Sequence, residues 1–163
     1  MSRRILFTAL IPALFLLSCI KKKEVVFVSD ETLIRQQLTL FEEALKKEKP
    51  ELLESYYARE KILVFPMWGK ENDSTWEEVI DNWKNFFADE NITEFTLKTV
   101  TVATSGRTGW AKGNWEMKIE KKKLFSQKKQ YQTLRGRYTV IFENKEGTWQ
   151  VVHEHMSSPA DKL

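Results

Sequence analysis

In the first half of the chain, apolar side chains recur every three or four positions, which is the spacing of one face of a helix. A first helix is predicted to begin near Ser29 or Asp30, because both residues are good N-caps. Its apolar face is formed by Ile34, Leu38, Phe41 and Leu45. Pro50 suits the first turn of a second, short helix that carries Tyr56 and Tyr57.

A short strand and a third helix are predicted next. The apolar run at residues 62–65 predicts the strand, and Pro66 ends it. Ser74 and Glu77 form a capping box for the third helix. The apolar face of this helix is rich in aromatic residues, namely Trp76, Val79, Ile80, Trp83, Phe86 and Phe87.

Beyond residue 91 the apolar period changes to two, which predicts β-strands. The apolar residues Phe95 and Leu97 occupy odd-numbered positions, whereas Val100 and Val102 occupy even-numbered ones, so the parity of the apolar positions switches between them. Because a one-residue offset turns side chains to the opposite face of a sheet, this switch predicts a β-bulge or sharp bend near Thr99. Three further strands are expected, around residues 115–119, 131–143 and 149–156.

The order of these elements predicts one α+β domain at residues 29–159, followed by a polar tail at 160–163. In this domain, three N-terminal helices pack on a strongly curved antiparallel sheet. The bend in the first long strand wraps the sheet around the helices, so a cavity is expected between the two layers.

The N-terminal segment has the features of a secretion signal. Arg3 and Arg4 precede an apolar run at residues 5–17, which is shorter than the about 20 residues that a membrane-spanning helix needs. The motif Leu16-Leu17-Ser18-Cys19 resembles the lipobox of bacterial lipoproteins. We therefore expect residues 1–18 to be removed, Cys19 to be lipidated, and residues 19–28 to form a tether. The domain would then be exported and anchored to membrane lipid in the bacterial cell envelope.

Charge and cysteine content narrow the possible partners. Loss of Arg3 and Arg4 lowers the formal net charge from +3 to +1, so nucleic acid is not expected as a partner. Cys19 is the sole cysteine, so no internal disulfide supports the fold. The sequence contains no glycine-rich phosphate loop and no paired-cysteine metal motif, and neither a cofactor nor a metal is expected.

Two segments of the last strands carry a resemblance to a known family. They are Gly136-Arg137-Tyr138-Thr139 and the stretch GTWQVVHEHMSSP from Gly147 to Pro159. With them the chain resembles the NTF2-like superfamily, specifically its SnoaL-like and DUF4440-type branch, and it is also similar to the association domain of calcium/calmodulin-dependent kinase II. The resemblance implies an NTF2-like cone with a pocket. Its members include isomerases, dehydratases, binding proteins and assembly domains, so fold alone does not decide the function.

The resemblance also implies where an enzyme of this kind would keep its catalytic base. In the isomerase-like members, a carboxylate follows the first strand. Residues 65–69 of this chain read Phe-Pro-Met-Trp-Gly and contain no carboxylate. This departure argues against isomerase-type catalysis at that position.

The only two histidines, His153 and His155, are two positions apart on the last predicted strand and therefore point to one face, together with Trp149 and Val151. If that face is internal, both imidazoles point into the cone or its mouth. They could act as acid, base or ligand contact, hold a metal together with a third ligand, or fix the strand by hydrogen bonds. We take His155 as the candidate acid–base residue and Tyr56 as a candidate donor.

The remaining candidates are ligand contacts. Arg137 shares a face with Thr139 and Ile141, and if that face is internal its charge needs a carboxylate from the protein or from a ligand. Aromatic residues with polar groups often line pockets. The predicted ligand-binding set is Tyr57, Trp83, Trp115, Arg137 and His153.

Three functions compete. The first is a binding module for a small, partly apolar or carboxylate-bearing molecule. The second is an isomerase-, dehydratase- or hydrolase-like enzyme that uses His155 as acid or base. The third is a homodimeric or oligomeric interaction module, whose exposed face would hold Val152 and Met156.

Overall fold

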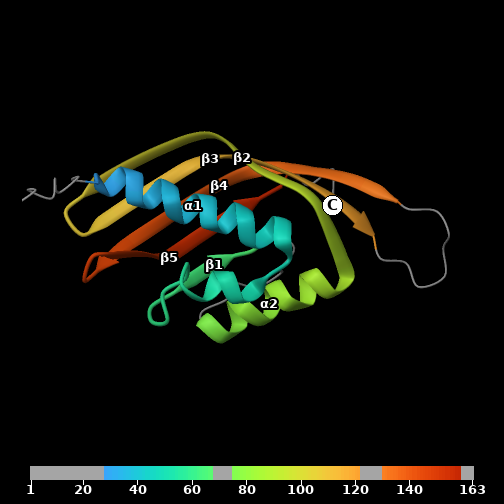
Figure 1. Ribbon diagram of the computed structural model, residues 1–163, viewed down its shortest axis with the longest axis horizontal. Coiled ribbons are helices and arrows are strands. Elements are labelled where there is room, and N and C mark those ends of the chain that lie inside the picture. Colours follow the sequence, from blue (N-terminus) through green and yellow to red (C-terminus); the bar gives the residue numbers. More distant parts are fainter. Residues whose placement is uncertain (1–27, 68–74, 122–129, 159–163) are drawn as a thin grey trace, which may run out of the picture.

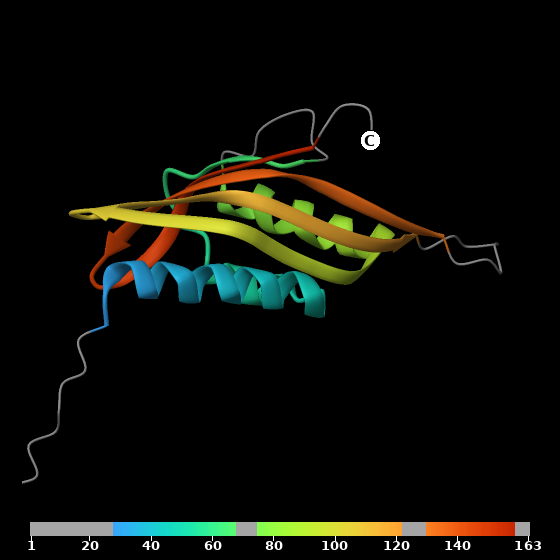
Figure 2. The same ribbon diagram turned by 90° about the horizontal axis from the view of Figure 1, so that it is seen from above.

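The computed structural model describes residues 28–67, 75–121 and 130–158, and in these ranges a curved five-stranded sheet arches over two α-helices (Figures 1 and 2). The elements are α1 (Asp30–Lys47), the 3-10 helix η1 (Pro50–Glu54), β1 (Leu63–Phe65), α2 (Trp76–Asp89), β2 (Glu90–Ser105), β3 (Thr108–Lys121), β4 (Tyr131–Lys145) and β5 (Thr148–Ser157). The strands lie in the order β1-β5-β4-β3-β2. The core fills the space between the sheet and the helices.

The predicted α+β architecture is confirmed, but two of its details are wrong. The described residues form two α-helices rather than three, because the second is the five-residue 3-10 helix η1 with bonds such as Tyr56 N–H to Leu53 C=O (3.1 Å). The sheet is mixed rather than antiparallel, because β1 runs parallel to β5. Hydrogen bonds from Ala58 N to Val151 O and from Val151 N to Tyr56 O, both 2.8 Å, draw the chain alongside β5 before β1 begins.

The helix caps follow the predicted chemistry. Ser29 is the N-cap of α1, as expected. The capping box of α2 is formed by Thr75 and Glu78, one residue later than predicted. This register turns Val79, Ile80, Trp83 and Phe87 toward the core. Neither helix in the described ranges is long and apolar enough to cross a membrane.

Two irregularities decide which side chains face the interior. The first is the predicted one, at Thr99, where φ is +53° and the β2–β3 register shifts between Lys98 and Thr101. The second lies between β4 and β5, where Ile141 pairs with His153 and its neighbour Phe142 pairs with Val151. Val152 is therefore an extra residue, and the side chains after it change faces.

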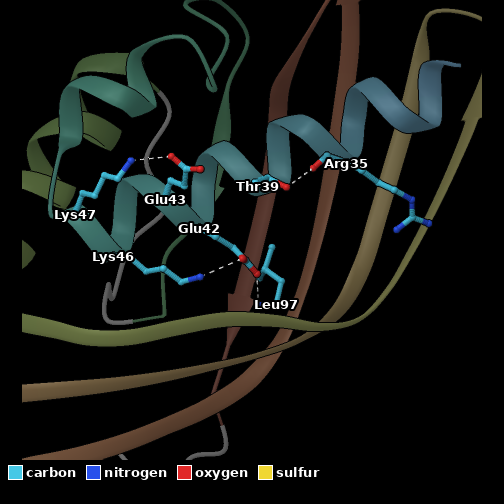
Figure 3. Close-up of polar contacts among 7 residues, drawn as sticks. All are labelled: Arg35, Thr39, Glu42, Glu43, Lys46, Lys47 and Leu97. Atoms are coloured by element: carbon cyan, nitrogen blue, oxygen red, sulfur yellow. Dashed lines mark hydrogen bonds and ion pairs between the residues drawn. The ribbon is translucent and has the colours of Figure 1, made fainter. Parts of the chain in front are cut away.

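The edge strand β2 is covered by carboxylates from α1 and from its C-cap residue, Glu48. Glu42 Oε1 accepts a hydrogen bond from Leu97 N (2.6 Å), and Glu48 Oε1 accepts one from Ile92 N (2.8 Å). Figure 3 shows Glu42 reaching from α1 to β2, while Lys46 pairs with its other oxygen at 3.4 Å. Unpaired N–H groups on an edge strand invite association with other chains, and these carboxylates satisfy two of them.

We predict that Glu42→Ala lowers the free energy of unfolding by about 2 kcal/mol, because it removes a charged acceptor from a backbone N–H group. Glu43→Ala is a matched control: Glu43 also pairs with a lysine four residues on, Lys47 at 2.8 Å, but its side chain is half exposed and bonds to no strand. That variant should lose no more than about 0.5 kcal/mol. Urea unfolding followed by tryptophan fluorescence measures both, and equal losses would contradict the assignment.

Candidate functional site

A buried carboxyl group lies at the centre of the candidate site. Glu154 on β5 is 2% exposed and is the one charged residue buried in the described part of the chain. Tyr57 Oη donates a hydrogen bond to its Oε1 at 3.0 Å, and Tyr56 Oη donates to its Oε2 at 3.5 Å. Both tyrosines are fully buried and immediately follow η1 and Ser55.

The two tyrosines are held differently. Trp83 Nε1 on α2 donates to Tyr57 Oη at 3.2 Å, so Trp83, Tyr57 and Glu154 form a continuous chain of hydrogen bonds. Such chains strengthen their members and fix their orientation. The bond from Tyr56 to Glu154 is at the upper limit of length, which leaves the Tyr56 hydroxyl the freer of the two to turn toward another acceptor.

Burial controls the protonation of this group. Desolvation raises the pKa of Glu154 from 4.5 to about 7, against the opposing effect of the hydrogen bonds from Tyr57 and Tyr56. The pKa values of Tyr56 and Tyr57 are raised well above 10, first by burial and then by the nearby Glu154, so both remain proton donors. Glu154 can therefore gain or lose a proton near neutral pH.

Glu154 and Tyr56 face a narrow interior space between the sheet and α1 that is too tight to hold a water molecule. Its lining residues are Leu38, Phe41, Tyr56, Leu97, Tyr138, Val140, Glu154 and Met156. The Tyr138 hydroxyl is buried and has no hydrogen-bond partner among the described residues. The interior cavity, as we call this space, is thus dry and apolar, with three polar groups at its wall.

A shallow groove of about 160 Å³ lies outside the interior cavity, between α1 and β2. It is lined by Arg35, Leu38, Thr39, Glu42, Leu97 and Val100, several of which appear in Figure 3. Leu38 and Leu97 line both spaces, so these two side chains form the wall between the interior cavity and the outside. A molecule that entered from this groove would pass Leu38 and Leu97 on its way to Glu154.

The structure brings together three of the residues predicted from the sequence. Tyr56, Tyr57 and Trp83 meet around Glu154 through the hydrogen bonds described above. Trp115 is also buried, at 1% exposure, but its Nε1 donates to Arg137 O at 3.2 Å and it does not line the interior cavity. The roles assigned to these residues stay predictions.

The expected inward orientation of the histidines is wrong. Because Val152 is an extra residue, the inward face changes from Trp149 and Val151 to Glu154 and Met156. His153 and His155 lie on the outer face, where the Phe65 ring is 5.8 Å from each imidazole. Partial burial and the neighbouring His155 lower the pKa of His153.

Two further orientations bear on the predictions: the sequence left the face of Arg137 open, and it placed Met156 on an exposed face. Arg137 is exposed on the outer face, because Tyr138 and Val140 take the inward positions of β4. Met156 is 3% exposed and belongs to the core, so it cannot form part of an exposed dimerisation face. Within the described ranges, no group of three histidine, cysteine, aspartate or glutamate side chains could hold a metal ion.

Glu154 is the residue that the sequence interpretation missed. Its signal is the same one that located the bulge at Thr99: the apolar parity changes between Val151 and Met156. A bulge at Val152 places Glu154 inward and supplies a buried carboxylate from β5. The absence of a carboxylate from residues 65–69 is therefore not decisive for the chemistry of the site.

Solved structures with this arrangement belong to the NTF2-like class. A ketosteroid isomerase-like protein from Erwinia carotovora atroseptica has a TM-score of 0.67 and 12% identity, covering 82% of this chain and 99% of that one. An NTF2-like superfamily protein from Salmonella enterica has a TM-score of 0.66 and 17% identity, covering 80% and 91%. A protein from Xanthomonas campestris is named for the calcium/calmodulin-dependent protein kinase II association domain. It has a TM-score of 0.65 and 15% identity, and the match covers 82% of this chain and 91% of that one.

The model of one family matches most of the chain. Residues 34–161 match the SnoaL-like domain, and the chain belongs to that family. This confirms the resemblance to the SnoaL-like and NTF2-like proteins, whereas the DUF4440-type branch stays a prediction. No curated protein matches the chain. At these identities the solved structures establish the fold and leave the chemistry to the site itself.

The buried carboxyl predicts how stability depends on pH. In the unfolded chain Glu154 releases its proton near pH 4.5, whereas in the folded protein it does so near pH 7. Between these values the folded state holds the extra proton, so its contribution is complete below pH 4.5 and is lost as pH rises through about 7. The free energy of unfolding should fall by about 3 kcal/mol across this window.

Glu154→Gln should remove this fall, because the amide does not titrate. Glu146→Gln, which removes an exposed carboxyl from the β4–β5 turn, is the control and should keep the wild-type fall because Glu154 is intact. Urea unfolding across pH 4.5 to 7 measures the three proteins. An unchanged pH dependence in Glu154→Gln would show that this carboxyl is not the titrating group.

Proposed function

We propose that this SnoaL-like domain binds a small, partly apolar molecule in the interior cavity, with the polar group of the molecule at Glu154 and Tyr56. The observation that supports this is the dry cavity with a carboxyl of pKa about 7 at its wall. An apolar core gains nothing from a buried carboxyl, whereas a ligand site needs a few convergent polar groups in an apolar lining.

The cavity favours a neutral ligand over an anionic one. Its polar groups are the carboxyl of Glu154 and the hydroxyls of Tyr56 and Tyr138, and no cation lines it. A ligand carbonyl or hydroxyl can bond with a neutral Glu154 or with the hydroxyls, but a ligand carboxylate would meet no opposite charge. Entry requires Leu38 and Leu97 to move and the space to widen, because it has no room for a water molecule as it stands, whereas ligand pockets begin at roughly 300 Å³.

An isomerase-like enzyme is the second candidate, and the raised pKa of Glu154 favours it. A group that titrates near neutral pH can accept and return a proton within one reaction cycle. In this version Glu154, rather than His155, transfers the proton, and Tyr56 stabilises the negative charge that develops on a substrate oxygen. Similarity to a ketosteroid isomerase-like fold is compatible with this chemistry.

Native mass spectrometry of protein purified gently from its source cells tests the binding proposal. The wild type should carry a discrete extra mass, and Tyr56→Phe should retain the molecule about tenfold less well, since the hydroxyl that it removes is a polar partner of the ligand and contributes about 1.4 kcal/mol or more. Arg107→Gln is the matched control and should retain it fully, because Arg107 lies at the β2–β3 turn, outside the cavity. Recovery of the molecule chemically altered after incubation would favour the enzyme. Equal loss in both variants would contradict the site.

We also propose that the domain is held at the bacterial envelope through lipidated Cys19, which lies outside the described residues. The support is the lipobox-like motif that ends at this sole cysteine. Several acyl chains on one residue give firm anchoring, whereas one chain gives only marginal binding.

Homodimerisation stays a prediction. Phe65, Trp110 and Tyr131 are large apolar side chains exposed on strands, at 40%, 39% and 63%, and a partner subunit could cover them.

Cys19→Ala should abolish labelling by radioactive fatty acid and move the protein from the membrane fraction to the soluble fraction. Ser2→Ala, in the same leader segment, is the control and should leave both unchanged. Immunoblots of fractionated cells measure the distribution. An undiminished membrane fraction for Cys19→Ala would contradict lipid anchoring at this residue.

A further inference from the structure

A second hollow lies on the opposite side of the sheet from the interior cavity, near the end of β5. It has a volume of about 470 Å³, within the usual range for sites of small organic ligands. The residues used below are Lys98, Glu116, Arg135, Arg137, Ser157 and Ser158, and together we call this hollow the outer groove. None of these residues lines the interior cavity.

Positive charge exceeds negative charge in the outer groove. Its charged side chains are Lys98, Arg135, Arg137 and the single carboxylate of Glu116. Lys98 Nζ and Arg135 Nε both contact Glu116 Oε2, at 3.0 and 2.7 Å. The hydrogen bonds from Arg135 and Lys98 lower the pKa of Glu116 to about 2, so the carboxylate stays ionised in the physiological range. One carboxylate thus offsets one of three cations.

Arg137 is the cation with no partner of opposite charge. It is exposed, and within the described ranges no carboxylate lies within 4.0 Å of its guanidinium. Its backbone, in contrast, is fixed: Trp115 Nε1 donates to Arg137 O at 3.2 Å, and Ser157 Oγ donates to the same oxygen at 3.5 Å. A guanidinium on a well-held backbone is suited to bind the paired oxygens of a phosphate or carboxylate.

A second guanidinium group lies in the same space. Arg135 uses its Nε atom on Glu116, and its terminal nitrogens have no hydrogen bond to a described residue. The hydroxyls of Ser157 and Ser158 lie at the groove wall but already donate their protons to backbone oxygens of β4, so the two arginines are the donors for an anion. Gly136 lies between the two arginines, and a Cβ atom there would overlap Ser157 O and the Trp115 ring. The glycine therefore permits the close packing that forms the floor of the groove.

We propose that the outer groove is an anion-binding site for a molecule that carries a phosphate or carboxylate group, with Arg137 as the principal contact. The site is separate from the interior cavity and does not depend on the function proposed for it. Arg135 and Lys98 add positive charge, while Glu116 keeps both cations in place and weakens the attraction for the anion. The volume exceeds that of a bare phosphate ion, so an organic group attached to the anion also fits.

Substitutions of Arg137 and Glu116 should change the affinity for an anion in opposite directions. The probe is glycerol 3-phosphate, a soluble phosphate monoester, measured by isothermal titration calorimetry with the full chain at low ionic strength. Arg137→Gln should weaken binding about tenfold, the effect of losing one charge-assisted pair. Glu116→Gln should tighten binding, because it removes the competing carboxylate. Arg107→Gln is the matched control: this exposed arginine lies at the β2–β3 turn, outside the groove, and should leave binding unchanged.

Vesicles separate the two sources of a phosphate group, a free metabolite and a lipid headgroup. Binding of glycerol 3-phosphate that depends on Arg137 supports the site with a soluble ligand. Arg137-dependent binding to phosphatidylglycerol vesicles, but not to phosphatidylcholine vesicles, supports the site with a lipid headgroup. Equal weakening by Arg137→Gln and Arg107→Gln shows only diffuse charge attraction and overturns the proposal, as does the absence of binding to both probes.

Discussion

A carboxyl group buried in an apolar core needs hydrogen bonds, and the arrangement around Glu154 supplies them from three parts of the chain. The donors are Tyr56 and Tyr57, which are held by backbone bonds between the segment after η1 and Val151. Trp83 of α2 orients Tyr57 in turn. Removal of any of these groups would leave a polar atom without a partner inside the protein, at a cost of about 1–3 kcal/mol. The position of η1, the packing of α2 and the path of β5 are therefore linked through one side chain.

The extra residue at Val152 makes this arrangement possible. Without the bulge, the alternation that starts at Trp149 would continue and would turn His153 and His155 inward and Glu154 outward. One inserted residue thus exchanges two imidazoles for a carboxyl at the wall of the cavity. It also places the histidines beside Phe65 on the outer face. The chemistry available inside the domain depends on this backbone irregularity as much as on residue identity.

Local patterns in the sequence were sufficient for most of the fold. The helical spacing of Ile34, Leu38 and Phe41 predicts α1, and the parity switch predicts the bend at Thr99, because both signals come from neighbouring residues. The parallel pairing of β1 with β5 and the 3-10 form of η1 depend on contacts distant in sequence, which no local pattern contains. Tyr56, Tyr57 and Trp83 were singled out as aromatic residues with polar groups, and they meet around Glu154, while their roles stay predictions. Glu154 was missed because the in-and-out alternation of side chains was assumed to continue through Val152. The pairing of β5 with β4 makes Val152 an extra residue and interrupts that alternation.

The carboxylates of α1 have a consequence for how the domain can open. Leu38 and Leu97 separate the interior cavity from solvent, and the same helix and strand are joined by the bond from Leu97 N to Glu42. A movement that admits a molecule past these leucines must therefore strain or break the cover over the edge of the sheet. The contact between α1 and β2 therefore controls access to the interior cavity and also protects the edge strand from pairing with other chains. A domain in which this contact opens more readily also aggregates more readily.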